Sequence, residues 1–305
     1  MYDFIVNPLS RSGQGHSIWK TVETELKKEN ITYEVHFTAH RRHATSIAEE
    51  ITKDGKEHTL IVLGGDGTIN EVINGIKYLD KCTLGYVPTG SSNDFSRGLG
   101  LPCDIKKAVT SVLHSGHSKL IDIGTIRYRN KKRRFAVSSG IGYDAAICHT
   151  VCISKLKVFL NKIKLGKLAY VGVSLDRLYH CRPAGMTVRL DSGQEFHYKR
   201  AYFAAAMNLP YEGGGCKFCP GAFCDDGLLD LIVIADVPKY RALAILPVVF
   251  SGGHTHMKGV HIVKCREAQI VSDNPLPIHT DGEPVFLQRK LTMALEPERL
   301  KIIIP

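Results

Sequence analysis

The sequence predicts two domains of different fold class: a doubly wound α/β domain over residues 1–120, then an antiparallel β-sandwich domain over residues 121–299. Up to about residue 120, short apolar segments alternate with segments of helical periodicity, which indicates a parallel sheet with helices on both faces. Beyond that point short strands of alternating polarity dominate, as is typical of an antiparallel sandwich. The terminal strand, 300–305, could belong to either domain.

The elements of each domain follow from these periodicities. In the first domain we expect strands at Tyr2–Asn7, Ile31–Thr38, Thr59–Leu63 and Thr83–Val87, and helices at Ile18–Lys28, Ala44–Lys53 and Thr68–Tyr78. In the second we expect strands at Leu120–Arg127, Phe135–Ser139, Met186–Leu190, Phe196–Ala206 and Leu228–Ile234, several more after Val260, and helices around Ser154–Tyr179 and Lys239–Phe250.

Composition limits the partners and the compartment. The net charge of +10 favours anionic partners, but no nucleic-acid-binding motif accompanies it, so we expect no nucleic acid. No apolar run reaches the roughly 20 residues of a membrane span, and the first residues do not resemble a signal peptide, so we expect a cytoplasmic protein. The nine cysteines are interpreted as reduced thiols. Cys216, Cys219 and Cys224 are interpreted as buried apolar residues rather than a zinc site.

Three glycine-rich turns each follow a predicted strand of the first domain. They are Asn7-Pro8-Leu9-Ser10-Arg11-Ser12-Gly13-Gln14-Gly15, Gly64-Gly65-Asp66-Gly67-Thr68 and Pro88-Thr89-Gly90-Ser91-Ser92-Asn93-Asp94-Phe95. In a parallel sheet such turns lie at the carboxyl ends of the strands, where ligands bind. Glycine lets backbone N–H groups approach phosphate oxygens, and the helix starting at Thr68 directs its positive dipole end toward them.

Asp66 is chemically informative because a carboxylate and a phosphate repel each other. Its presence in such a turn makes sense if Mg²⁺, usually bridged by water, lies between them. The P-loop pattern G-x-x-x-x-G-K-[ST] is absent, and G-x-G-x-x-G does not follow the first strand. The three turns together predict a nucleotide site of another kind.

At these turns the sequence resembles the diacylglycerol kinase catalytic-domain family, which includes bacterial soluble lipid kinases, sphingosine kinases and ceramide kinases. The resemblance covers nearly the whole chain. It rests on Phe4-Ile5-Val6-Asn7-Pro8, on Gly64-Gly65-Asp66-Gly67-Thr68-Ile69-Asn70-Glu71-Val72, on Pro88-Thr89-Gly90-Ser91-Ser92-Asn93-Asp94-Phe95, on Gly140-Ile141-Gly142-Tyr143-Asp144, on Asp225-Asp226-Gly227-Leu228-Leu229-Asp230 and on Asp281-Gly282-Glu283-Pro284.

The resemblance implies an α/β nucleotide domain, an all-β second domain, and ATP with Mg²⁺ as cofactors. The residues that it places around ATP are Asn7, Ser10, Thr38, Gly65, Asp66, Gly67, Thr68, Glu71, Ser91 and Asn93. The first loop departs from the family pattern, since Arg11 follows Ser10 and the glycines come later.

The resemblance also assigns acidic residues of the second domain. It implies Glu283 or Asp281 as the general base beside Asp66, with Glu283 favoured, because a kinase needs a group that accepts the proton of the attacking hydroxyl. It implies a second, structural Mg²⁺ held by the Asp226 carboxylate and the main-chain carbonyls of Phe223 and Leu228.

The function that follows is transfer of the γ-phosphate of ATP to a hydroxyl of a membrane lipid, most simply diacylglycerol. A basic amphipathic segment, 153–167, and a basic turn, 128–134, predict peripheral attachment to an anionic membrane. An exposed edge of the sandwich could pair in a homodimer. Two alternatives stay open: a kinase of the NAD kinase type, and a non-catalytic regulator that binds nucleotide or lipid.

Overall fold

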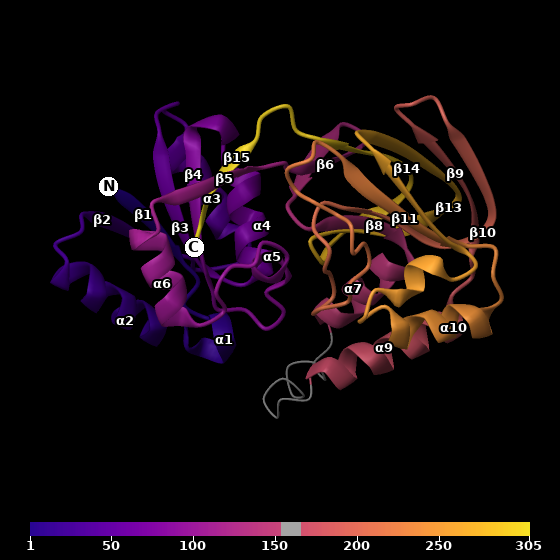
Figure 1. Ribbon diagram of the computed structural model, residues 1–305, viewed down its shortest axis with the longest axis horizontal. Coiled ribbons are helices and arrows are strands. Elements are labelled where there is room, and N and C mark those ends of the chain that lie inside the picture. Colours follow the sequence, from indigo (N-terminus) through magenta and orange to yellow (C-terminus); the bar gives the residue numbers. More distant parts are fainter. Residues whose placement is uncertain (154–165) are drawn as a thin grey trace. The chain divides into compact units, whose positions relative to one another are not determined.

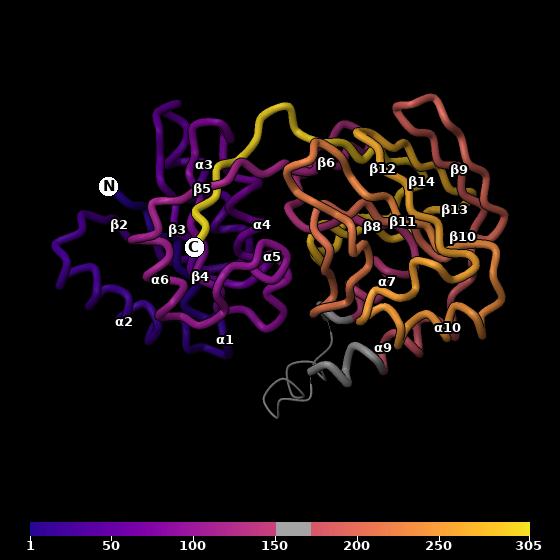
Figure 2. The backbone as a smooth tube through the Cα atoms, viewed as in Figure 1, coloured from indigo at the N-terminus to yellow at the C-terminus, as the bar shows by residue number. Residues whose placement is uncertain are grey.

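The computed structural model describes residues 1–153 and 166–305 (Figure 1). The chain divides into two compact units. Unit 1 contains Met1–Ile123 and Pro297–Pro305, and unit 2 contains Gly124–Glu296. Figure 2 shows the C-terminal segment, in yellow, running back among the strands of unit 1. Within the described residues, no helix has both the length and the apolar character needed to cross a membrane.

In the described part of the chain, unit 1 is built on a six-stranded sheet in the order β2-β1-β3-β4-β15-β5. The strands are β1 (Tyr2–Val6), β2 (Tyr33–Phe37), β3 (His58–Gly64), β4 (Cys82–Pro88), β5 (His117–Ile121) and β15 (Leu300–Ile304). β1 to β4 are parallel, β15 is parallel to β4, and β5 runs antiparallel at the edge. The predicted parallel α/β domain is confirmed, and the C-terminal strand completes its sheet.

Helices cover both faces of this sheet. They are α1 (Ser10–Gly13), α2 (Gly15–Lys28), α3 (His43–Thr52), α4 (Asp66–Gly75), α5 (Asp94–Gly98) and α6 (Ile105–His114), with a 3₁₀ turn at Leu79–Lys81. Trp19 of α2 and Val109 of α6 pack in one apolar cluster with Phe4 and Ile61 of the sheet. Because side chains alternate along a strand, the neighbouring Ile5 is buried on the opposite face. α3 and α4 pack together and against β1 and β3.

Unit 2 is an antiparallel β domain, as predicted. Its described strands are β6 (Gly124–Tyr128), β7 (Lys131–Phe135), β8 (Ser138–Gly142), β9 (Ala184–Leu190), β10 (Glu195–Met207), β11 (Leu229–Ala235), β12 (Val260–Cys265), β13 (Glu267–Thr280) and β14 (Glu283–Leu295). They follow the order β12-β11-β10-β8-β13-β14-β6-β7, and β9 pairs with both β10 and β13. β8 and β9 therefore occupy successive stretches between the two long strands β10 and β13.

Both faces of the sheet of unit 2 are covered. Leu231 and Val233 of β11 belong to a core enclosed by strands, whereas Ile232 and Ile234 belong to a second cluster under helices. The helices are α7 (Tyr143–Ile153), α9 (Gly166–His180) and α10 (Lys239–Val248), followed by a 3₁₀ turn at Gly253–His256. Burial on both sides explains why β11 is apolar without interruption from Leu231 to Ala235.

The structure corrects three predicted elements and, in the part of the chain that it describes, adds helices that were not predicted. Leu120–Arg127 is not one strand: β5 ends at Ile121 in unit 1 and β6 begins at Gly124 in unit 2. Of the helix expected at Ser154–Tyr179, the portion 154–165 lies outside the described residues, and α9 begins at Gly166. Phe135–Ser139 is not one strand either, because β7 ends at Phe135 and β8 begins at Ser138. Helices α1, α5, α6 and α7 were not predicted.

The second and third glycine-rich turns meet at backbone distance. A Cβ atom built on Gly90 would lie 2.6 Å from the Cα of Gly65, and one on Gly65 would lie 3.0 Å from the Cα of Gly90. Since the obstructing atom is backbone, it cannot move aside as a flexible side chain can. Glycine at both positions lets the ends of β3 and β4 present their turns together.

We therefore expect Gly90→Ala to destabilise unit 1 by roughly 1–3 kcal/mol, the usual range for an overpacked site. Trp19 is the only tryptophan in the chain and is buried in unit 1, so its fluorescence during urea unfolding reports on that unit. Ser91→Ala, at an exposed position of the same turn, is the control and should leave the midpoint unchanged. Equal midpoints for wild type and Gly90→Ala would contradict the close approach.

Candidate functional site

The three predicted phosphate-binding turns form one connected structure at the carboxyl ends of β1, β3 and β4. The Asn7 side chain donates a hydrogen bond to Thr68 Oγ1 (3.1 Å), which joins the first turn to the second. The Thr89 hydroxyl donates to Ser10 Oγ (2.8 Å), which joins the third turn to the first. The sequence placed these turns at one sheet edge, and the side chains confirm that they meet.

Asp66 connects the second turn to the third. Its carboxylate accepts hydrogen bonds from the backbone N–H groups of Asp94 (3.2 Å) and Phe95 (3.3 Å), at the start of α5. Asp66 is also the first residue of α4, whose N-terminal N–H groups and dipole favour an anion. A carboxylate beside backbone donors suits Mg²⁺ bound through water to a phosphate group.

The other residues expected around ATP lie at the start of α4, before α5, after β2 and beside the loop before α3. Gly67 belongs to the first turn of α4, and Asn93, with a left-handed φ of 52°, precedes α5. Thr38 follows β2, and its N–H donates to the Val6 carbonyl (2.9 Å). Glu71 faces the loop before α3, because its carboxylate accepts from Arg42 N–H (2.7 Å).

Asp281 and Glu283 differ in their surroundings. The Asp281 carboxylate accepts three backbone hydrogen bonds, from the N–H groups of Ala136 (2.9 Å), Val137 (2.8 Å) and Ser138 (3.0 Å). These bonds hold a turn in which Asp281 has a φ of 48°. Glu283 follows as the first residue of β14 and is half-buried. Of the two carboxylates that the sequence left as alternatives for the general base, Asp281 therefore stabilises a backbone turn, whereas Glu283 begins a strand.

At the predicted structural Mg²⁺ site, Asp226 contacts a cationic side chain of the chain itself. Asp226 Oδ1 accepts from Leu228 N–H (3.0 Å), and its Oδ2 accepts from Lys264 Nζ (2.6 Å). The same ammonium lies 3.5 Å from Asp230 Oδ2 and 3.4 Å from the Gly221 carbonyl. Hydrogen bonding to Asp226 raises the pKa of Lys264, which keeps it charged. This arrangement fits Mg²⁺ poorly, because the ammonium already neutralises the carboxylate.

The structure describes the three clustered cysteines and one of the two basic segments that the sequence singled out. Cys219 and Cys224 are buried and Cys216 is half-buried, and burial raises the pKa of Cys219 well above its ordinary value. The predicted basic turn, 128–134, is mostly strand, since β6 ends at Tyr128 and β7 begins at Lys131. Lys132 (2.5 Å) and Arg134 (2.6 Å) of β7 form ion pairs with Glu296. The segment 153–167, expected to contact a membrane, lies mainly outside the described residues.

An apolar cavity of about 390 Å³ lies within unit 2, between the sheet and the helices. This volume is in the usual range for small-molecule sites, about 300–1,000 Å³. Its wall is formed by Ile147 of α7, Leu178 of α9, Phe203 of β10 and Ile245 of α10, among other apolar side chains. The sequence analysis did not predict this cavity, because its lining comes from segments that are distant along the chain.

The cavity wall includes side chains that are exposed to solvent and two carboxylates. Leu175, Leu243 and Phe250 line it and are 45%, 44% and 48% exposed, which gives it an apolar rim. Asp144 and Glu212 also line it. Both contact the buried His279, a histidine that the sequence analysis did not single out. Asp144 itself lies in the quoted Gly140–Asp144 motif.

The contacts of Lys264 lead to a test with metal ions. Lys264→Met should lower the melting temperature in metal-free buffer, because it leaves Asp226 and Asp230 without their counter-charge. Adding MgCl₂ should then raise it, while wild type without nucleotide should respond little. Lys258→Met is the matched control, because Lys258 is exposed and is not a partner of Asp226. Strong stabilisation of wild type by Mg²⁺ alone, abolished by Asp226→Asn, would restore the predicted metal site.

Two family descriptions match the chain. The diacylglycerol kinase catalytic domain matches residues 2–126, and the YegS C-terminal NAD kinase beta sandwich-like domain matches residues 137–304. A Bacillus subtilis protein named "Putative lipid kinase YtlR" is 30% identical over 98% of both chains. The protein named "Diacylglycerol kinase" from the same organism is 31% identical over 92% of this chain and 88% of its own length.

Solved structures agree with these matches. The crystal structure titled as that of "a putative diacylglycerol kinase" from Bacillus anthracis is 25% identical, with a TM-score of 0.77, and covers 100% of this chain and 96% of its own. An NAD kinase from Archaeoglobus fulgidus, solved with ATP, shares the fold, with a TM-score of 0.54 and 12% identity over 99% of this chain and 93% of its own. Given the family matches and the two Bacillus subtilis relatives, the chain belongs to the diacylglycerol kinase family of lipid kinases and is a phosphotransferase.

Proposed function

We propose that this enzyme transfers the γ-phosphate of ATP to the free hydroxyl of diacylglycerol and so produces phosphatidic acid. The apolar cavity of unit 2 is the observation that carries this substrate assignment. It offers an acyl chain an enclosed apolar surface, and its exposed rim of Leu175, Leu243 and Phe250 suits entry from a lipid surface. NAD, a polar dinucleotide, would gain little from such a lining.

The nucleotide would bind at the connected turns of unit 1. Backbone N–H groups at Gly65 and Gly90 and the start of α4 would donate to its phosphates, and Asn7, Ser10 and Thr68 would support them. Mg²⁺, when bound near Asp66, would neutralise charge on the phosphate oxygens. Thr89, which the sequence analysis did not assign to ATP, belongs to the same network through Ser10.

In the proposed reaction the lipid hydroxyl oxygen forms a bond to the γ-phosphorus. The bond from that phosphorus to the β,γ-bridging oxygen breaks, ADP leaves, and the hydroxyl proton passes to a carboxylate. Glu283 is the better acceptor for that proton, since the Asp281 carboxylate already accepts three backbone hydrogen bonds. A carboxylate that is held by several N–H donors is a weaker base.

The substrate is tested by transfer of ³²P from γ-labelled ATP in mixed micelles with Mg²⁺. Diacylglycerol, phosphatidylglycerol, a sphingoid base and NAD are offered separately and in competition. Labelled phosphatidic acid as the main product is the expected result. Labelled NAD would move the enzyme to the NAD kinase type of activity. Binding of ATP with no labelled product from any of the four would favour a non-catalytic regulator.

The two carboxylates are separated by paired substitutions. Glu283→Gln should lower kcat by about 10²–10⁴-fold, the usual contribution of a general base, with an unchanged melting temperature. Asp281→Asn should instead lower the melting temperature, because three backbone donors lose a charged acceptor, at about 1–3 kcal/mol overall. If Asp281→Asn folds normally and is inactive while Glu283→Gln stays active, the roles are reversed.

A further inference from the structure

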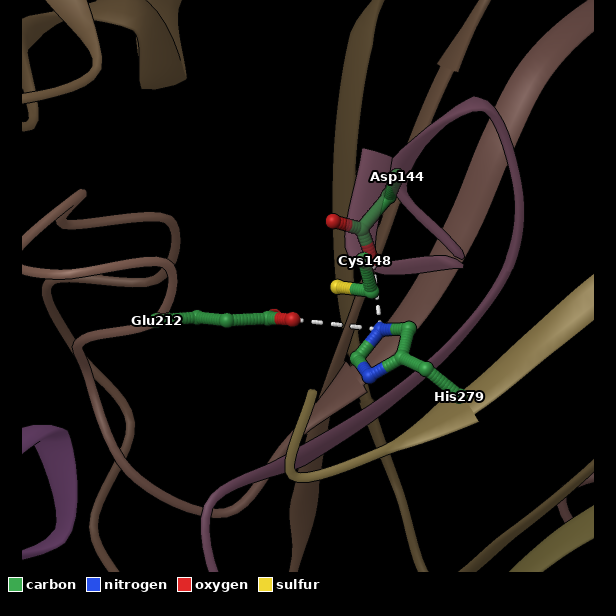
Figure 3. Close-up of side chains that lie close together, drawn as sticks. All are labelled: Asp144, Cys148, Glu212 and His279. Atoms are coloured by element: carbon green, nitrogen blue, oxygen red, sulfur yellow. Dashed lines mark hydrogen bonds and ion pairs between the residues drawn. The ribbon is translucent and has the colours of Figure 1, made fainter. Parts of the chain in front are cut away.

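Four side chains converge at the polar part of the cavity wall (Figure 3). Asp144 and Cys148 come from one side of α7, Glu212 from the loop after β10, and His279 from β13. Asp144, Cys148 and Glu212 line the cavity, whereas His279 is fully buried behind them. We call these four residues the polar cluster. Its carboxylates interrupt a wall that is otherwise mainly apolar.

His279 fixes the two carboxylates in place. Its Nε2 lies 2.6 Å from Asp144 Oδ2 and 3.1 Å from Glu212 Oε1. When the ring is neutral, its Nδ1 accepts a hydrogen bond from Gly282 N–H (3.2 Å), and its Nε2 carries the proton and donates it to Asp144 Oδ2. Glu212 Oε1 faces the same nitrogen at ion-pair distance. The histidine thus acts as a positioning residue for two groups that face the cavity.

The charge of the polar cluster depends on the state of the histidine. Burial lowers the pKa of His279, but the carboxylates of Glu212 and Asp144 outweigh burial and raise that pKa to about 9. With both carboxylates ionised, one imidazolium leaves a net charge of −1, and a neutral ring leaves −2. Charges interact more strongly next to apolar groups than in bulk water, so ionised carboxylates in this wall would act on a nearby ligand.

The backbone beneath the polar cluster leaves no room for a side chain. A Cβ atom on Gly140 would lie 2.3 Å from Asp144 Oδ2 and 2.6 Å from His279 Nε2. β8 therefore passes directly behind the carboxylate–imidazole pair, and its glycine lets that pair pack against the strand. This packing gives the Asp144 carboxylate a fixed position in the cavity wall.

We propose that Asp144 and Glu212 select the head of the lipid in the complex that forms before phosphoryl transfer: either carboxylate accepts a hydrogen bond from a neutral hydroxyl or cationic amine head, and together they reject a lipid whose acceptor hydroxyl is next to a phosphate. This inference rests on the proposed function, because it takes the cavity to be the lipid site. The selection has two parts. Carboxylates are good acceptors for hydroxyl and ammonium donors, and a phosphate near them is disfavoured by like-charge repulsion.

A metal ion is the competing occupant, because the four donor atoms lie within 4.8 Å of one another. The hydrogen bond from Gly282 argues against it. That bond leaves the proton on Nε2, the nitrogen that faces the other donors, and a metal ion can bind only a nitrogen without a proton. The hydrogen-bonding site is therefore the better reading, and metal content becomes an outcome of the test.

The test measures binding without ATP, so that it does not depend on phosphoryl transfer. The probes are dioctanoylglycerol and dioctanoylphosphatidylglycerol, which have equal acyl chains and differ in the head. Their dissociation constants are measured by calorimetry for wild type, Glu212→Gln and Asp144→Asn. Glu195→Gln is the matched control, since it removes the same charge from the same unit at a residue outside the cavity wall.

Wild type should bind dioctanoylglycerol at least about tenfold more tightly than the phosphatidylglycerol, which corresponds to about 1.4 kcal/mol. Glu212→Gln and Asp144→Asn should each reduce that ratio several-fold, and Glu195→Gln should preserve it. If one variant proved unstable, the affinity ratio of the other variant would still test the proposal. The preference would hold even if no phosphorylated lipid were found, which separates this inference from the proposed function.

Three results would overturn the proposal. If wild type bound the two lipids with equal affinity, there would be no head-group selection. If the ratio of the two dissociation constants were unchanged in both variants, residues other than Asp144 and Glu212 would cause the selection. A stoichiometric metal ion in wild type purified with no added metal, lost in His279→Gln, would make the polar cluster a metal site.

Discussion

The three backbone hydrogen bonds to the Asp281 carboxylate support most of the chemistry of unit 2. They join the end of β13 to the segment before β8, across about 140 residues of sequence. Each charged hydrogen bond of this kind is worth about 1.5–3 kcal/mol, more than the roughly 1–2 kcal/mol of a left-handed backbone conformation. The turn can therefore keep Asp281 at positive φ. His279 precedes this turn and Glu283 follows it, so one anchor positions both the polar cluster and the proposed base.

The cavity arises from how the sheet of unit 2 is covered. One face encloses a core of strand side chains, and helices α7, α9 and α10 cover the other. The space between this sheet and its helices is lined by apolar groups, with carboxylates at one part of the wall. In unit 1 the opposite constraint applies. Gly65 and Gly90 bring two turns so close that no side chain fits between their backbones.

Much of unit 1 could be predicted because its signals are local. A period of two or 3.6 residues identifies each strand or helix, and each glycine-rich turn directly follows its strand, so topology alone brings the turns together. The junction near residue 121 was missed because apolar alternation runs from β5 into β6 across the boundary between the units. Helix α7 was missed because it is apolar on most sides and lacks a clear amphipathic period.

The contacts that matter most in unit 2 could not be predicted, since they join distant residues. Lys264 lies 38 positions from Asp226, and His279 lies 135 positions from Asp144. Nothing in the local sequence around a lone lysine or histidine distinguishes it from a surface residue. The late Asp-Gly-Glu motif was recognised from a resemblance, but only the backbone contacts of Asp281 separate its two carboxylates.

Photoaffinity labelling tests the central claim, that the cavity of unit 2 is the lipid site, most directly. A diacylglycerol with a photoreactive group at the end of one acyl chain would be irradiated with the protein, and the modified peptides identified by mass spectrometry. The account predicts adducts on peptides of α7, β10 and α10, reduced by an excess of unlabelled diacylglycerol. Adducts confined to unit 1, or spread over the surface without competition, would contradict it.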